Sequence, residues 1–282
     1  MHKIMLLFAA GFLVCLGLII GADPAIHAPQ QPDAPAATAS PAPTASPTPL
    51  PVLPTPGQST PLQKTALPFT PDDPEYYESL FMAVEQQDPP NHELQTYLPQ
   101  QVRVEGNHLT FTAQKKEDDY VSGRLESIFS FQYGTIRFRI NTMQGEGLFP
   151  AVWMLPANGH PAPEVDIYEL IGSEPDTFYG VIHYLTNANR TRNRLFFNHV
   201  FPSDAIPESY VLTFEWTPDA LNWYLEDTLI HSITEQVPQM PMYLIFNLAV
   251  GGDWAGDLAP DALPAQLHIE MLDFAPQEIY TR

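Results

Sequence analysis

The sequence predicts an all-β protein whose folded part is a sandwich of two β-sheets. Two observations lead to this prediction. Short runs of alternating apolar and polar residues recur from Val102 onward with turn-forming residues between them, and no stretch has the spacing of a long amphipathic helix. Alternation with a period of two places the apolar side chains of a strand on one face, and strands of this kind bury those faces against a second sheet.

The first 22 residues have the composition of an export signal. Lys3 precedes an apolar run from Ile4 to Ile20, and the small residues Gly21 and Ala22 follow it. Cleavage after Ala22 would release a secreted protein. An uncleaved run would instead tether the protein to the outer face of the membrane, and the sequence leaves both outcomes open.

Residues 23–69 are predicted to be a disordered linker. They hold 13 of the 31 prolines of the chain, with Ala, Thr and Ser between them. Proline keeps such a segment extended, and apolar residues that could form a core are missing from it. The sequence therefore predicts a single folded domain over residues 70–282, held away from the cell surface by the linker.

The folded domain carries the whole negative charge of the chain. The chain has 33 acidic residues against 12 Lys and Arg, a formal net charge of −21, and only two residues of each sign precede Thr70. Nucleic-acid binding depends on Lys and Arg at the phosphates, so this charge argues against a nucleic-acid partner and also against a polyanionic substrate. The single cysteine, Cys15, allows neither an intramolecular disulfide nor a thiolate metal site.

A hairpin opens the series of predicted strands. Val102 and Val104 alternate with polar residues before the turn Glu105-Gly106-Asn107, and Leu109 and Phe111 alternate after it. Further strands are predicted over residues 134–140, 210–216, 221–225, 242–250 and 267–274.

Two features of these later strands bear on the core. The run 242–250 is apolar nearly throughout, which is typical of a central strand buried on both faces. Trp216 and Trp223 lie within predicted strands, so we expect them to be core or outer-face residues.

The hexapeptide Glu164-Val165-Asp166-Ile167-Tyr168-Glu169 carries the candidate chemistry. In an extended strand Glu164 and Asp166 share one face, and the apolar residues between them face the core. Strict alternation would put Glu169 on the other face, but one extra residue, a β-bulge, would return it to the face of the first two acids. Three acids on one face repel each other and cost stability, which favours a functional site over a solvated strand.

Several segments resemble glycoside hydrolase family 16, in its laminarinase-like (endo-β-1,3-glucanase) branch. The acids have the ExDxxE spacing of that branch, whereas the lichenase and xyloglucan-transglycosylase branches usually have ExDxE. The resemblance covers about residues 75–282. The matching segments, in chain order, are Asn91–Tyr97, Tyr120–Leu125, Gly147–Pro156 with the acid motif, His183, and Asn247–Trp254.

The resemblance implies a fold and a reaction. The family fold is a concanavalin A-like β-jelly roll whose concave face forms an open glycan cleft, which agrees with the sandwich expected from alternation. The resemblance also implies that Glu164 is the nucleophile, Glu169 the general acid/base, and Asp166 the helper between them. A retaining glycosidase needs two carboxyl groups about 5–5.5 Å apart, one ionised and one protonated, and neighbouring acids push their pKa values apart in that direction.

Five further residues are predicted to bind the substrate, and each also has an ordinary structural reading. Trp153 and Trp254 could stack on a sugar ring or pack in the core. Arg124 and Asn91 could hydrogen-bond sugar hydroxyls. His183 follows an apolar pair of residues, so only the resemblance raises it above a structural histidine.

Two other features allow weaker predictions. Arg190, Arg192 and Arg194 form a basic patch, which is either a solvated strand edge or a contact to an acidic glycan. Asp273 lies near the place where the final strand of the family can supply a calcium ligand, so a structural calcium is possible. The chemistry itself requires no metal or cofactor, and the sequence has no GxSxG, HExxH or GxxxxGK[ST] motif.

These observations together predict a secreted, retaining endo-β-glucanase that cuts β-1,3- or mixed β-1,3/1,4-glucan. A galactanase such as an agarase shares the spacing of the acids, and a transglycosylase shares the chemistry. A glycan-binding lectin could use the same sandwich, but a lectin needs no acid pair. The expected partner is a polysaccharide, with membrane contact only through residues 1–22, and we expect a monomer.

Overall fold

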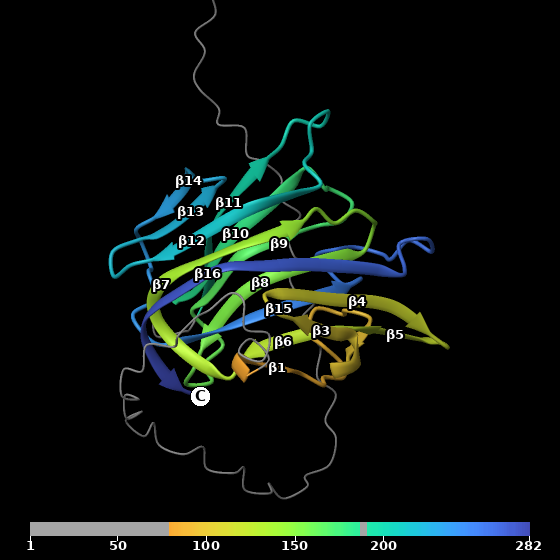
Figure 1. Cartoon of the computed structure of the whole chain (residues 1–282), viewed down its shortest axis with the longest axis horizontal. Helices are drawn as coiled ribbons and strands as arrows, with labels where there is room; N and C mark the ends of the chain where they lie inside the picture. The colour runs from red at the N-terminus through yellow and green to blue at the C-terminus, as the bar shows by residue number, and fades with distance from the viewer. Residues whose placement is uncertain (1–78, 187–190) are drawn as a thin grey trace, which may run out of the picture. The chain divides into compact units, whose positions relative to one another are not determined.

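Two stacked β-sheets make up the part of the chain that the computed structural model describes, residues 79–186 and 191–282 (Figure 1). The first, which we call the front sheet, holds the acid motif on an interior strand. Its strands in spatial order are β11 (Thr191–Val200), β10 (Thr177–Thr186), β9 (Glu164–Leu170), β8 (Leu148–Pro156), β15 (Met242–Val250), β6 (Arg124–Ser127) and β1 (Phe81–Ala83).

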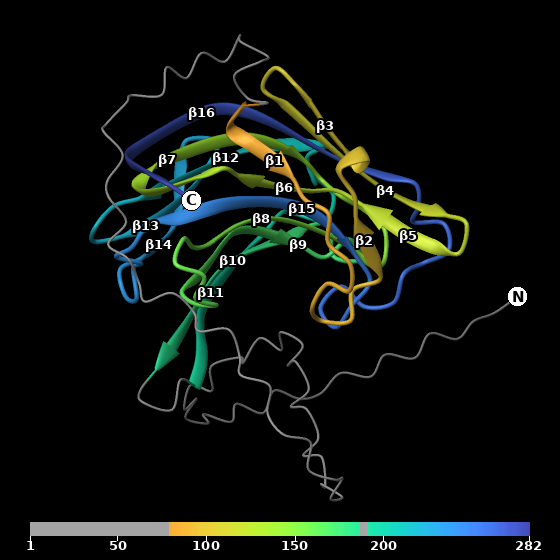
Figure 2. The same cartoon turned by 90° about the horizontal axis from the view of Figure 1, so that it is seen from below.

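The second sheet, which we call the back sheet, lies against the inner face of the first, and Figure 2 shows the two as layers. A single residue pair, Met242 with Phe131, joins the ladders of the two sheets. The strands of the back sheet in spatial order are β14 (Thr228–Ile233), β13 (Leu221–Leu225), β12 (Ser209–Trp216), β7 (Phe129–Asn141), β16 (Ala265–Thr281), β4 (His108–Lys116) and β3 (Val102–Glu105).

A short connection completes the described part. After the back-sheet strand β4, the chain forms β5 (Asp119–Ser122), which pairs with β4 and, in parallel, with β2 (Gln95–Tyr97). One 3₁₀ turn, η1 (Pro99–Gln101), follows β2. No helix within the described residues is long and apolar enough to cross a membrane.

The all-β, two-sheet jelly-roll prediction is confirmed, and the predicted strands are present. The hairpin forms from β3 and β4, with Glu105 opposite His108 and the intervening Gly106 at φ 58°. That backbone conformation favours glycine, which explains the residue at the turn. The runs 221–225 and 242–250 coincide with β13 and β15, and the other three predicted runs lie inside β7, β12 and β16.

One of the segments that resemble the family is only partly a strand. The segment Asn91–Tyr97 forms a strand only at its end, as β2, while Asn91 and His92 have positive φ angles of 63° and 57°. Asn91 instead belongs to a loop, where its backbone carbonyl accepts a hydrogen bond from the N–H of Asp253. A positive φ is incompatible with an extended strand, so regular pairing begins only after these two residues. β2 is three residues long and pairs with β5 alone among the named strands.

Aromatic side chains fill the space between the two sheets. Trp216, Trp223, Phe178 and Phe246 are all almost completely buried, and burial of a side chain of this size contributes about 1.5–3 kcal/mol. Trp216 and Trp223 are therefore core residues. β15 is buried along nearly its whole length, as its apolar sequence predicted.

The predictions for residues 1–22 and 23–69, and the domain boundary at residue 70, lie outside the described residues. They stay predictions.

Candidate active site

A β-bulge in β9 gathers the three acids on the outer face of the front sheet. Against β8, Asp166 pairs with Trp153 and Glu169 pairs with Ala151, so β9 uses one residue more than its neighbour. The same shift occurs against β10. The bulge that the sequence predicted is confirmed, and with it the return of Glu169 to the face of the other two acids.

The other face of β9 anchors the acids in the core. Val165, Ile167, Tyr168 and Leu170 are all fully buried. Because adjacent side chains on a strand point to opposite faces, burial of Val165 turns Glu164 and Asp166 outward.

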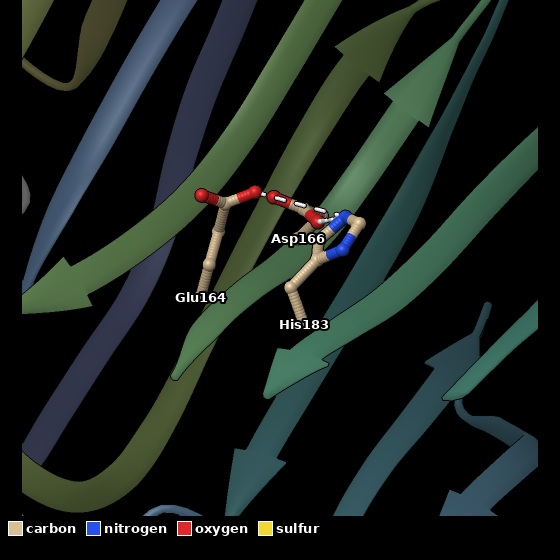
Figure 3. A group of neighbouring side chains, drawn as sticks. All are labelled: Glu164, Asp166 and His183. Atoms are coloured by element: carbon tan, nitrogen blue, oxygen red, sulfur yellow. Dashed lines mark ion pairs between the residues drawn. The ribbon is translucent and has the colours of Figure 1, made fainter. Parts of the chain in front are cut away.

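His183 on β10 lies between two of the acids. Its Nε2 is 3.7 Å from Oε1 of Glu164 and 3.4 Å from Oδ2 of Asp166, and Figure 3 shows the three side chains turned toward one another from neighbouring strands. Burial, followed by the charges of Arg192 and Arg194, lowers the pKa of His183 to about 4. The imidazole is therefore neutral at neutral pH, and it contacts the acids as a neutral ring rather than as an ion pair.

The three carboxyl groups differ in their electrostatic surroundings. Burial, and then the negative charge of Glu164, raises the pKa of Glu169 to about 8. Burial, and then the charges of Glu169 and Glu164, raises the pKa of Asp166 well above its usual value. Burial also raises the pKa of Glu164, but the charge and hydrogen bond of Arg192 lower it. Glu169 is thus protonated at neutral pH, and of the two glutamates Glu164 is the one that contacts a cation.

Glu164, Asp166 and His183 also form the only group of three potential metal ligands among the described residues, with ligand atoms within 4.8 Å of one another. The guanidinium of Arg192 already donates to Oε1 of Glu164 at 2.7 Å, and it would repel a metal cation at the same oxygen. We therefore assign the group to acid–base chemistry. The predicted calcium ligand Asp273 lies exposed on β16, and calcium binding there stays a prediction.

Trp153 lies beside the acids and is held by polar and cationic neighbours. Its Nε1 donates a 2.7 Å hydrogen bond to Oδ1 of Asn247 on β15. The guanidinium carbon of Arg124 lies 5.1 Å from the centroid of the Trp153 ring, and the guanidinium is paired with Glu126 at 2.6 Å. Trp153 is only partly buried, so the ring is a surface-facing platform and not a core residue.

The two remaining predicted binding residues lie in loops that border the outer face of the front sheet. Trp254 packs edge-on against Tyr179 at 5.7 Å between ring centroids, and Tyr179 is the β10 partner of Glu169. Asn91 is exposed in the loop next to Asp253. The structure thus places all eight predicted site residues on the outer face of the front sheet or on the loops that border it.

Three side chains of this face were not predicted as site residues. Asn247 fixes Trp153, and its Nδ2 donates to the hydroxyl of Tyr97 at 3.1 Å. Glu93 accepts a 2.7 Å hydrogen bond from Gln95, and burial raises its pKa. Arg192 contacts Glu164. Alternation indicated that Arg192 and Arg194 share a face, but only the pairing of β11 with β10 shows that this face is the one with the acids.

The comparisons with known proteins agree with this geometry. The family model described as glycosyl hydrolases family 16 matches residues 91–263. A beta-glucanase of Rhodothermus marinus is 30% identical over 213 residues, which are 64% of this chain and 73% of that protein. The endo-1,3-1,4-beta-glycanase ExsH of Rhizobium meliloti is 34% identical over 137 residues, 48% of this chain and 29% of that protein.

A solved structure shows the same fold. The laminarinase from Rhodothermus marinus superposes with a TM-score of 0.59 at 28% identity, covering 72% of this chain and 90% of that one. The family model covers the bulged strand β9, both flanking strands and the loop before β2. The chain therefore belongs to glycosyl hydrolases family 16 and is a glycoside hydrolase.

Proposed function

We propose that the protein is an endo-acting, retaining hydrolase of β-1,3- or mixed β-1,3/1,4-glucan. The observation that carries the proposal is the geometry of one bulged strand, which brings Glu164, Asp166 and Glu169 to the same face beside His183 and Arg192. Glu164 contacts a cation, and Glu169 is held protonated by burial and by its neighbour. A retaining glycosidase needs one ionised and one protonated carboxyl group on either side of the scissile bond.

Each residue has a defined part in the two steps. The carboxylate of Glu164 attacks the anomeric carbon, the glycosidic bond breaks, and the departing oxygen takes the proton of Glu169. Water then attacks the anomeric carbon from the opposite side, gives its proton to the carboxylate of Glu169, and the sugar leaves Glu164. Asp166 lies between these groups, where burial and the charges of Glu169 and Glu164 raise its pKa.

The outer face also supports a sugar polymer as the substrate. The partly exposed ring of Trp153 offers a flat apolar surface, and such a surface suits the apolar face of a pyranose. The polar groups of Arg124, Asn247 and Glu93 lie around it for contacts with hydroxyls. The choice of β-glucan rests on the names of the relatives, which include a beta-glucanase, an endo-1,3-1,4-beta-glycanase and a laminarinase. Export through residues 1–22 is part of the same proposal, because a polymeric glucan lies outside the cell.

The test is product analysis on a panel of polysaccharides. We expect laminarin and barley mixed-linkage glucan to yield short oligosaccharides, with the β-anomer as the first product seen by NMR. Carrageenan and agarose should give no products. Cleavage of a galactan without cleavage of either glucan would make a galactan, and not β-glucan, the substrate. An α-anomer as the first product would exclude retention.

A further inference from the structure

Arg192 reaches Glu164, the nucleophile of the proposed function, from the edge of the front sheet. It lies on β11, which pairs on one side with β10 among the described strands, and its register partner is Leu185. Its side chain crosses β10 and donates from Nη2 to Oε1 of Glu164 on β9, at 2.7 Å. The arginine therefore spans two strands to contact a single oxygen of one carboxylate.

This contact is poorly placed to stabilise the fold. The side chain of Arg192 is 54% exposed, whereas that of Glu164 is 19% exposed. Ion pairs with a solvent-exposed partner contribute little to folding, because water screens the charge and the long side chain loses freedom. The partly buried carboxylate, in contrast, gains a cation in a site crowded with acids. The benefit of the contact is thus local to Glu164.

The other groups that face Glu164 make Arg192 distinctive. The strand of Glu164, β9, contributes the acids Asp166 and Glu169, and β10 contributes the neutral His183. On β11, the guanidinium of Arg194 lies 5.5 Å from the ring centroid of Phe196, and no described hydrogen bond or ion pair joins it to Glu164. Within the described residues, Arg192 is therefore the one cation in hydrogen-bond contact with the nucleophile.

We propose that Arg192 is a positioning residue that holds Oε1 of Glu164, keeps the carboxylate charged, and leaves Oε2 free to attack the sugar. This inference rests on the proposed retaining mechanism. In the first step Oε2 forms the bond to the anomeric carbon, the bond to the leaving oxygen breaks, and Glu169 supplies the proton. Oε1 then becomes the carbonyl oxygen of the ester, still hydrogen-bonded to Arg192.

The second step uses the same contact in reverse. Water attacks the anomeric carbon and gives its proton to Glu169, the bond to Oε2 breaks, and the negative charge returns to the carboxylate beside Arg192. The arginine thus lowers the energy of the ionised nucleophile before attack and of the departing carboxylate after it. For Arg192, the contact to an acid of the enzyme differs from both readings of the basic patch, a solvated strand edge and a contact to an acidic glycan. Arg190 lies outside the described residues.

The experiment measures the reactivity of the nucleophile separately from proton donation by Glu169. A 2-deoxy-2-fluoro β-glucan oligosaccharide with a dinitrophenyl leaving group labels a nucleophile without needing a proton from Glu169. The rate of labelling is measured against pH in the wild type, Arg192→Gln and Arg192→Lys, and the labelled residue is identified by mass spectrometry. In the profile of labelling rate against pH, we expect the acidic limb of Arg192→Gln to lie at a pH higher by about one unit or more. An adjacent opposite charge shifts the pKa of a carboxyl group by about 1–3 units, and this variant lacks that charge. Arg192→Lys should restore most of the wild-type limb.

Arg137→Gln is the matched control. Arg137 lies on β7 of the back sheet and pairs with Asp227 at 3.0 Å, so its removal takes away one cation and one ion pair far from β9. The acidic limb of the labelling-rate profile of Arg137→Gln should coincide with that of the wild type. Arg192→Met is a second variant without the charge, and thermal melting of each protein reports on folding.

Three outcomes would overturn the inference. The first is an unchanged acidic limb in Arg192→Gln or Arg192→Met with wild-type melting, while Glu164 is still the labelled residue. The second is an equal shift in Arg137→Gln, which would make the effect one of net charge. The third is a wild type that is never labelled on Glu164, and that result alone would also overturn the proposed assignment of Glu164 as the nucleophile.

Discussion

The indole Nε1 of Trp223 donates a 2.9 Å hydrogen bond to the backbone carbonyl of Ile167. Ile167 is the residue at the bulge of β9, and it has no register partner on β8 or β10. Its carbonyl lies in the core, where loss of a hydrogen bond is costly. A core residue of the back sheet thus supports the irregularity that brings Glu169 beside the other acids.

We therefore expect Trp223→Phe to weaken both the fold and the reaction. Removal of the donor takes one hydrogen bond from the buried Ile167 carbonyl, which costs about 0.5–1.5 kcal/mol of unfolding free energy. The bulge should also lose its fixed geometry, so kcat on glucan should fall while KM changes less. Urea unfolding and steady-state kinetics measure the two effects.

Trp216→Phe is the control for this prediction. Trp216 is equally buried and donates from Nε1 to the carbonyl of Pro238 at 3.2 Å, but it does not touch β9 through that bond. It should lose a similar amount of stability and keep its kcat under conditions where both variants are folded. Equal losses of kcat in the two variants would show that Trp223 has no special connection to the site.

The sequence predicted the bulge but not what holds it. The spacing of three acids with apolar residues between them requires one extra residue, because only then do Glu164 and Glu169 share a face. Trp223 stands 54 residues after Glu169 in the sequence, and no local pattern connects it to Ile167. The contact depends on how the two sheets stack, which alternation does not specify.

A second prediction concerns the pKa of about 8 at Glu169. The folded state keeps a proton that an unfolded glutamate, with a pKa near 4.5, has already lost. Between these values the folded protein binds more protons than the unfolded one, so the contribution of Glu169 to stability falls as pH rises. Glu169→Gln removes this penalty, and we expect it to be more stable than the wild type at pH 8 and about equal at pH 4. Urea midpoints at the two pH values measure the difference.

The same group predicts the alkaline limb of activity. Hydrolysis of glucan needs the proton of Glu169, so the rate should decline as pH rises through about 8. An aryl glycoside with a good leaving group needs no such proton in the first step, and its glycosylation rate should decline less. A polymer profile that stays level to pH 10 would contradict the assignment of the acid.

A third prediction separates the two contributions of Trp153. Trp153→Phe keeps an aromatic surface but loses the hydrogen bond to Asn247, whereas Trp153→Ala loses both. An aromatic contact contributes about 0.5–1.5 kcal/mol, so we expect KM for laminarin to rise roughly threefold to tenfold in Trp153→Ala. The KM of Trp153→Phe should lie between those of Trp153→Ala and the wild type. A KM unchanged in Trp153→Ala would mean that the ring does not contact the sugar.

The proposed binding residues were harder to predict than the acids for a physical reason. The acids lie within six residues of one strand, so local geometry fixes their shared face. Trp153 and Asn247 come from β8 and β15, and Arg192 from the far edge of the sheet, so their meeting depends on strand order. The resemblance to the family located Trp153 and His183, but Arg192 was recognised only as part of a basic patch.

The last prediction distinguishes the roles of the two glutamates by the products that azide forms. Glu169→Ala lacks the acid, so its rate on glucan should fall by about 10²–10⁴-fold. It should still react with an aryl glycoside that has a good leaving group, and then stall as the glycosyl-enzyme because no base activates water. Azide, which needs no base, should release that intermediate as a β-glycosyl azide.

Glu164→Ala lacks the nucleophile, so it should be inactive on both substrates. Azide can then enter from the vacated side of the sugar, and the product should be the α-glycosyl azide. Asp166→Asn serves as the comparison, because it keeps both glutamates and should be impaired on both substrates but less than Glu164→Ala. NMR of the anomeric proton identifies each azide. An α-azide from Glu169→Ala together with a β-azide from Glu164→Ala would reverse the two roles, and the cation at Arg192 would then pair with the acid instead of the nucleophile.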